Sequence, residues 1–267
     1  MRDPRWRPAP LLRASVALHL LAVLLVIMEP GRWRWALAAV LADHLLLMLA
    51  GLWPRSNWLG PNWTRLPAAA AARNEIALTI DDGPDPVVTP QVLELLDRHA
   101  VRATFFCVGE RAARYPELCR EIARRGHAVE NHSQRHRHHF ALRGYSGLMR
   151  ELQAAQDTLA AITGRRPAFF RAPAGLRNPL LDPVLARLGL HLASWSVRAY
   201  DTRTGDAERV ESRLLRGLRP GAILLLHDGN AARTPEGVPV ILAALPAVLA
   251  AAGAAGLRFV TLQQALS

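Results

Sequence analysis

The sequence predicts an α/β domain built on parallel strands, preceded by a pair of membrane-spanning helices. From Glu75 onward, short apolar segments of β type alternate with longer amphipathic segments about seven times. Repetition of strand, helix and strand in this way is typical of a parallel sheet covered by helices. Before residue 54 the pattern is different, with two long apolar stretches. At 267 residues the chain has room for one large domain and an additional segment.

The apolar stretches at residues 11–28 and 35–53 are each about long enough to cross a bilayer as a helix. Each is interrupted by only two ionisable residues: Arg13 and His19 in the first, Asp43 and His44 in the second. Tryptophans lie at the ends of the stretches, as in interfacial aromatic belts: Trp33, Trp35 and Trp53. Residues 1–53 are therefore predicted to form a transmembrane hairpin.

A cleaved signal peptide is the alternative, with the first basic residues as its start. The hairpin is favoured because no small-residue cleavage pattern follows Met28 and a second apolar stretch comes at once. Asp43 and His44 are costly inside a span, so they mark either function or a pair with His19. We expect a pair that is shallow or faces the other helix.

Arginines flanking the spans favour an inside N-terminus and a main domain on the cytoplasmic side of the inner membrane. Four lie before or at the start of the first span, two lie in the hairpin turn and two follow the second span: Arg2, Arg5, Arg7, Arg13; Arg32, Arg34; Arg55, Arg65. The difference in arginine content between the two sides is small. If only one stretch spans, the domain lies on the opposite side.

Residues 54–74 are rich in Pro, Asn and Ala and are predicted to be a linker, with the catalytic domain at 75–267. The expected strands are 76–80, 103–108, 127–131, 168–172, 191–197, 222–227 and 257–262. The expected helices are 89–99, 110–125, 146–162, 179–188, 206–217 and 238–252. A doubly wound sheet and a barrel both fit this pattern.

The chain carries a formal net charge of +11, and all of its basic charge is arginine. The absence of lysine excludes a Schiff-base or lysine-amine mechanism. No arginine stripe alternates with aromatics, so no nucleic-acid partner is expected; a membrane lipid surface or a phosphorylated carrier suits the charge better. The two cysteines, Cys107 and Cys119, are expected to be packed, free thiols that leave the redox compartment open.

Asp81 and Asp82 follow the first strand and precede Gly83-Pro84. On a continuing strand their side chains point to opposite faces, but a turn at Gly83 brings both to one edge. An Asx turn or a helix cap explains such a pair equally well by itself. His227 similarly ends an apolar strand, where it is either a catalyst or a structural histidine.

His132 and His136 are four residues apart, a spacing that suits two imidazoles on one metal. A solvated basic patch is the alternative, because His138 and His139 follow, and His139 competes as a ligand. With Asp82, the two imidazoles make a one-carboxylate site with open positions, suited to hydrolytic Zn²⁺; Co²⁺, Ni²⁺ or Mn²⁺ also fit. Since the motifs end several different strands, they favour a barrel, whose active site gathers such residues.

With Arg171-Ala172-Pro173-Ala174-Gly175 and Asp201, these motifs occur in the order of the polysaccharide deacetylase family, carbohydrate esterase family 4, which residues 75–267 resemble. The resemblance implies an irregular (β/α)₇ barrel and a metal-dependent hydrolase that removes an N-acetyl group from an acetamido sugar of an envelope glycan or glycolipid. The expected partners are that N-acetylated glycan or a lipid-linked sugar and membrane lipid, with no obligate protein partner.

The resemblance also implies a role for each residue. The metal ligands are Asp82, His132 and His136; the general base is Asp81 and the general acid is His227. Arg171 holds Asp81, Asp201 tunes His227, and the Ala174 backbone N–H binds the oxyanion. Leu225, Trp195 and Pro173 are the expected substrate-binding residues.

The sequence departs from the family pattern at Arg198, Thr202 and Ala174, where Asp, Trp and an aromatic residue are frequent. These departures alter the sugar groove and favour a lipid-linked or phosphorylated glycan. A deformylase or O-deacetylase remains an alternative, as does an inactive glycan-binding module. Retention of Asp81 and His227 disfavours the module, and the lack of a second metal site disfavours a phosphoesterase.

Overall fold

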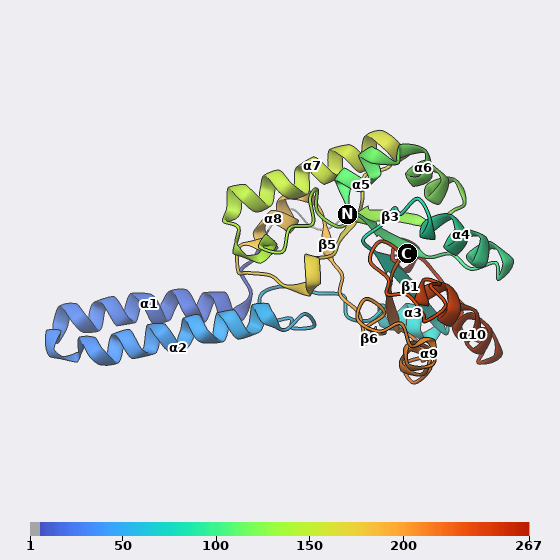
Figure 1. Ribbon diagram of the computed structural model, residues 1–267. Helices are drawn as coiled ribbons and strands as arrows, with labels where there is room; N and C mark the ends of the chain where they lie inside the picture. Colours follow the sequence, from blue (N-terminus) through green and yellow to red (C-terminus); the bar gives the residue numbers. More distant parts are fainter. Residues whose placement is uncertain (1–5, 267) are drawn as a thin grey trace.

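The protein consists of a barrel-like α/β domain and a long helical hairpin that projects from it (Figure 1). A computed structural model describes residues 6–266. Arg2 and Arg5, which contribute to the predicted topology, lie outside the described residues.

The described strands form one parallel sheet in the order β5-β4-β3-β2-β1-β7-β6, with β8 paired to the start of β1. Their bounds are β1 Glu75–Asp81, β2 Thr104–Cys107, β3 Ala128–Asn131, β4 Phe169–Phe170, β5 His191–Leu192, β6 Val197–Arg198, β7 Ile223–His227 and β8 Arg258–Phe259. The predicted parallel α/β fold is confirmed, and the sheet is an incomplete barrel rather than a doubly wound sheet.

The prediction of one strand over 191–197 is wrong, because two short strands occupy it. β5 and β6 are opposite edges of the sheet, and only four residues join them. Within this connection, Ser194 donates its backbone N–H to Trp63, and Ser196 donates to Ile223 of β7. The chain therefore passes within four residues from one edge of the incomplete barrel to the other.

Helices cover the outer face of the sheet (Figure 1). Their bounds are α4 Val88–Arg98, α5 Gly109–Arg114, α6 Pro116–Arg124, α7 Tyr145–Thr163, α8 Leu181–Leu188, α9 Ala207–Leu215 and α10 Val240–Ala254; short 3₁₀ turns are η2 Phe140–Leu142, η3 Pro173–Gly175 and η4 Gln264–Leu266. The single helix expected at 110–125 is instead α5 and α6. Pro116 lacks the N–H that a continuous helix needs, so a new helix starts there.

The alternation of side chains along β1 directs Asp81 toward the inside of the barrel. Ile76, Leu78 and Ile80 pack in the core beneath the helices, whereas Ala77 packs in the core inside the ring. Because side chains alternate along a strand, Asp81 faces inward with Ala77. Apolar side chains fill much of the interior below it, and Asp81 lies at the carboxyl end of the strand.

Residues 54–74, predicted to be a linker, pack against the barrel and include a short helix, α3 Ala68–Ala72. Trp63 forms a parallel bridge with Ala193. Its ring is edge-on to that of Phe169, with 5.1 Å between the two ring centres. Leu66 and Ala70 are buried in the core inside the ring. This segment therefore supplies part of the core of the barrel.

The hairpin consists of α1 Pro10–Met28, η1 Pro30–Arg32 and α2 Trp33–Leu52, lying side by side (Figure 1). By length and composition, both limbs are sufficient to cross a membrane, a property that signal sequences and buried core helices share. Most of their large apolar side chains are exposed. At the barrel end, the backbone N–H of Arg177 donates to the carbonyl of Gly51, which ties α2 to the domain.

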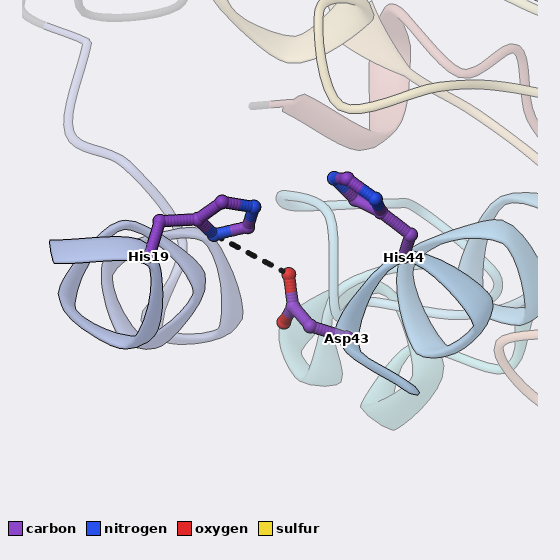
Figure 2. A group of neighbouring side chains, drawn as sticks. All are labelled: His19, Asp43 and His44. Atoms are coloured by element: carbon purple, nitrogen blue, oxygen red, sulfur yellow. Dashed lines mark ion pairs between the residues drawn. The ribbon is translucent and has the colours of Figure 1, made fainter. Parts of the chain in front are cut away.

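Asp43 of α2 faces α1 and is nearly buried between the two helices. The Ser15 hydroxyl donates to Asp43 at 2.6 Å, and His19 Nδ1 lies 3.9 Å from the same carboxylate. Figure 2 shows His44 reaching the other side of this group, with its ring 5.2 Å from that of His19. The polar residues thus join the two helices, as the expectation of a helix-facing pair required.

Candidate active site

A turn at Asp82 brings two consecutive carboxylates to the barrel mouth. Asp81 ends β1 on the inward face, and Asp82 adopts a left-handed backbone conformation with φ of 74°. This conformation is unusual outside glycine, and it cancels the alternation that otherwise separates neighbouring side chains. The Asn230 side-chain amide donates to Asp82 Oδ2 at 2.8 Å, which leaves Oδ1 directed elsewhere.

Asp82, His132 and His136 form a compact group with the chemistry of a metal site. Asp82 Oδ1 lies 3.3 Å from His132 Nε2 and 3.1 Å from His136 Nε2. One ligand atom from each residue falls within 4.8 Å of the others. A carboxylate and two imidazoles on one side of a metal leave positions open for water and substrate.

The hydrogen bonds around this group leave its ligand atoms free. His132 donates Nδ1–H to the backbone carbonyl of Arg171 at 2.8 Å, so in the neutral ring that a metal requires the lone pair is on Nε2, which faces Asp82. Asp82 Oδ1 is buried and has no hydrogen-bond partner in the described chain. Burial lowers the pKa of His136 to about 4, which keeps that imidazole neutral and able to ligate. These residues fit a divalent cation.

The Asp82 carboxylate stays ionised in spite of its surroundings. Burial raises the pKa of Asp82, but electrostatic interactions with the neighbouring imidazoles, that of His132 first, hold the pKa well below its usual range. A permanent negative charge at the centre of two imidazoles favours cation binding. His139, which the sequence left as a competing ligand, is exposed and lies outside this group, as does His138.

Arg171 holds Asp81 in a single orientation. The guanidinium is 1% exposed and donates to Asp81 Oδ1 at 2.7 Å. It also donates to the Thr79 hydroxyl and to two backbone carbonyls, and it stacks 4.1 Å from the centre of the Phe106 ring. A buried arginine with all of these partners cannot move away from the carboxylate. Asp81 Oδ2, the other oxygen, lies 3.8 Å from His132 Nε2, next to the metal-binding group.

Asp201 holds His227 in the same manner. Its Oδ1 accepts from His227 Nδ1 at 2.9 Å, and its Oδ2 accepts from the His227 backbone N–H at 2.6 Å. Burial lowers the pKa of His227, but the hydrogen bond and charge of Asp201, with the charges of Asp81 and Asp82, outweigh it and raise the pKa to about 9. His227 is therefore a charged imidazolium at neutral pH.

The candidate base and acid occupy matching positions on neighbouring strands. Asp81 of β1 pairs in register with His227 of β7, so both side chains leave the sheet on the same face. One is a carboxylate held by an arginine, and the other is an imidazole held by a carboxylate. Together they place a proton acceptor and a proton donor at the mouth, beside the metal-binding group.

The remaining predicted residues lie around the same mouth. Ala174, in η3, has a left-handed φ of 54°, a strained conformation that functional loops often retain. Leu225 lies on β7 on the same face as His227, and it is 1% exposed. Trp195 and Pro173 are also buried, and the Trp195 ring lies 5.9 Å from the Arg171 guanidinium. Of these residues, the side chains of Leu225 and Trp195 belong to the apolar wall beneath the mouth.

Two contributors were not identified from the sequence. Asn230 orients Asp82, and Thr79 joins Arg171 to β7 through its hydroxyl, which donates to Leu224 at 2.6 Å. Asn230 lies three residues after His227, in the loop after a strand, which was the available signal. Thr79 lies two residues before Asp81 and shares its face, but threonine is common in strands and carries no such signal.

Comparisons with known proteins place the chain in a class of hydrolase that agrees with this site. Residues 68–193 match the polysaccharide deacetylase family model. A chitooligosaccharide deacetylase of Azorhizobium caulinodans is 39% identical over 165 residues, covering 61% of this chain and 78% of that protein. A peptidoglycan-N-acetylglucosamine deacetylase of Bacillus cereus is 31% identical over 215 residues, covering 78% of this chain and 75% of that protein.

The fold agrees with the same class. The crystal structure of the Bc1960 peptidoglycan N-acetylglucosamine deacetylase, in complex with a substituted N-oxidanyl-benzamide, superposes with a TM-score of 0.69 at 28% identity. It covers 76% of this chain and 91% of that one. The chain belongs to the polysaccharide deacetylase family, and its barrel is the (β/α)₇ fold that the resemblance implied.

Proposed function

We propose that the protein is a membrane-anchored, metal-dependent N-deacetylase that acts on an acetamido sugar of an envelope glycan or glycolipid. The observation that carries the proposal is the pairing of Asp81 with His227 beside the Asp82, His132 and His136 group. The deacetylase activities of its relatives support the reaction class.

Asp82, His132 and His136 would hold the cation, and one carboxylate with two imidazoles suits Zn²⁺. When bound, a divalent cation lowers the pKa of a water molecule and polarises the carbonyl of the substrate. The donor set and the partnerless Asp82 Oδ1 support this assignment.

The chain's own residues then divide the proton transfers. Asp81, held in place by Arg171, accepts the proton from the attacking water. Attack converts the planar amide carbon to a tetrahedral one, and the Ala174 backbone N–H would stabilise the oxyanion. His227 donates its proton to the departing amine, because an amide nitrogen leaves poorly without one. The bond to Asp201 keeps that proton available.

The two apolar helices support anchoring in the inner membrane, and the arginine flanks support a domain on its cytoplasmic side. Such a position suits a substrate that is itself attached to the membrane. Substrate binding by Leu225, Trp195 and Pro173 belongs to the same proposal. Since they are buried, the acyl methyl and the sugar would contact only their edges at the mouth.

Acyl release by the full chain in detergent micelles with Zn²⁺ tests the reaction class. Acetate from an N-acetylglucosamine oligomer, in excess over acetate from an O-acetylated sugar and over formate from an N-formylated one, supports an N-deacetylase. Preferential formate or ester cleavage would assign the site to a deformylase or an O-deacetylase instead.

A further inference from the structure

A second, strongly basic cavity lies at the junction between the hairpin and the barrel. Its volume is about 590 Å³, and its lining comes from the end of α2 and the segment around β6 and α9. Five arginines contribute to the lining, with no carboxylate among its residues: Arg55, Arg198, Arg203, Arg213 and Arg216.

Within residues 6–266 none of these five arginines forms an ion pair. Other arginines on the barrel commonly pair with nearby carboxylates, as Arg125 does with Asp97 and Glu121. Five like charges around one cavity repel each other, and this repulsion costs free energy unless an anion enters. The cavity therefore has the electrostatic character of an anion site.

Aromatic rings hold two of the guanidinium groups in place. Arg198 lies between Trp195 and Tyr200, 5.3 Å and 5.0 Å from the ring centres, and its Nε is buried without a hydrogen-bond partner. Arg213 lies 5.2 Å from the Tyr200 ring and donates to the carbonyl of Ala199. Planar guanidiniums positioned in this way suit phosphate oxygens, which accept paired N–H donors.

The cavity adjoins both the membrane helix and the catalytic mouth. Trp53, Pro54 and Arg55, which follow α2 directly, form one wall. Arg198 pairs in register with Leu225, two residues before His227 on β7, so it faces the same side of the sheet as the candidate acid. Asp201, which holds His227, follows Tyr200 in the chain. A ligand in this cavity would therefore lie between the end of α2 and the edge strand next to the one that carries the candidate acid.

We propose that this arginine cavity binds the phosphate or pyrophosphate of a lipid-linked acetamido sugar, and so selects a membrane-bound substrate. The inference rests on the proposed deacetylase function, and it adds the substrate class. The hydrocarbon chain would lie beside the hairpin, the phosphate in the cavity and the acetamido group at the Asp81–His227 pair. A soluble neutral glycan carries no anionic group that could neutralise these five arginines, which form no ion pairs among the described residues.

The binding half of the test does not depend on catalysis. Inorganic pyrophosphate is titrated calorimetrically into the full chain in detergent, with EDTA present. The wild type should bind, and Arg198→Gln should weaken the affinity about tenfold. The double variant Arg203→Gln/Arg216→Gln, whose side chains are exposed and without hydrogen bonds among the described residues, should do the same if Arg198→Gln folds poorly. Arg150→Gln on α7 has the same charge change and should bind as the wild type does.

The second half compares polyprenyl-pyrophosphate-linked N-acetylglucosamine with a neutral chitin oligomer. The lipid-linked sugar should displace pyrophosphate, and the oligomer should not. In zinc-loaded protein, the cavity variants should lower the ratio of kcat/KM for the lipid-linked sugar over the oligomer about tenfold, and Arg150→Gln should leave it unchanged.

Three results would overturn the proposal: no pyrophosphate binding by the wild type, cavity variants that bind as Arg150→Gln does, or a lipid-linked sugar that fails to displace pyrophosphate. A fourth result would also overturn the proposal. If pyrophosphate binding is lost in phosphatidylglycerol bilayers and the cavity variants leave the kcat/KM ratio unchanged, the cavity binds a lipid headgroup instead. Absence of acetate from both substrates would refute the deacetylase instead, and the displacement result would still decide the cavity.

Discussion

Asp201 holds His227 by accepting two hydrogen bonds, one from the imidazole Nδ1–H at 2.9 Å and one from the backbone N–H at 2.6 Å. The first bond fixes the ring and its charge, and the second fixes the strand end that carries it. Asp201 is fully buried, so its negative charge acts without screening by water. The arrangement raises the pKa of His227 to about 9 and keeps a proton on the candidate acid.

Replacing Asp201 with asparagine should move the alkaline limb of the pH–activity profile to lower pH. The amide retains a hydrogen-bond acceptor but removes the charge that opposes burial, so the pKa of His227 should fall from about 9 toward 6.5 or below. An acid must be protonated, so activity is lost as pH rises through that pKa. The profile of kcat for acetate release measures the shift.

Asp157→Asn is the matched control, since it removes a carboxylate from the exposed face of α7. Its profile should equal that of the wild type. The raised pKa of His227 also contributes stability that is present below pH 6.5 and lost as pH rises through about 9. An unchanged alkaline limb in Asp201→Asn would mean that His227 is not the group titrating there.

Removing Arg171 should destabilise the fold as well as abolish activity. Arg171→Ala leaves the buried Asp81 without its cation and several buried acceptors without donors, so the free energy of unfolding should fall by about 3–5 kcal/mol. The exposed Arg166, paired with Asp157 at 3.6 Å, provides the control. Arg166→Ala should change stability by less than about 1 kcal/mol. Urea unfolding in detergent measures both, and equal effects would contradict a structural role for Arg171.

Metal binding should depend on His136 and not on His139. His136→Ala removes one of three converging ligands and should weaken zinc binding by more than about 100-fold, beyond the effect typical of an outer partner. His139→Ala removes an exposed imidazole outside the group and should leave the affinity unchanged. Competitive titration against a zinc chelator gives both affinities. Equal affinities would place the metal elsewhere.

Deletion of residues 1–53 should be tolerated better than deletion of residues 1–74. The longer deletion removes Leu66 and Ala70 from the core inside the barrel, and with them the backbone bonds between Trp63 and the β5–β6 connection. We expect the fragment 54–267 to unfold cooperatively and the fragment 75–267 to aggregate or melt at lower temperature. Circular dichroism gives the melting temperature of each fragment. Equal values would mean that residues 54–74 act as a linker and do not stabilise the barrel.

Much of this fold was predictable, because apolar strands such as Ile223–His227 are long enough to be recognised and motifs at their ends carry chemistry. The short strands β5 and β6 were not, because their boundary depends on pairing with Trp63 and Ile223, which are distant in sequence. For the same reason residues 54–74 resembled a linker. Their Pro, Asn and Ala content is typical of loops, and only the tertiary contacts of Leu66 indicate a core role.

The sequence was sufficient to identify most residues of the candidate site, but not their arrangement in space. A tight turn after Asp81 was expected, but the left-handed backbone of Asp82 that directs Oδ1 toward the imidazoles is a property of the folded chain. The unpaired arginines beside Trp53 and Tyr200 come from three separate segments, so sequence spacing could not bring them together.

The most direct test of the central claim is zinc-dependent acetate release from an N-acetylglucosamine oligomer by the full chain, compared with Asp81→Asn. Asparagine keeps the shape and the bond from Arg171 but cannot accept the proton from water. The account predicts no release without metal, release with Zn²⁺, and a loss of at least about 100-fold in kcat for Asp81→Asn with zinc still bound. Undiminished release by the variant, or release that persists after metal removal, would contradict it.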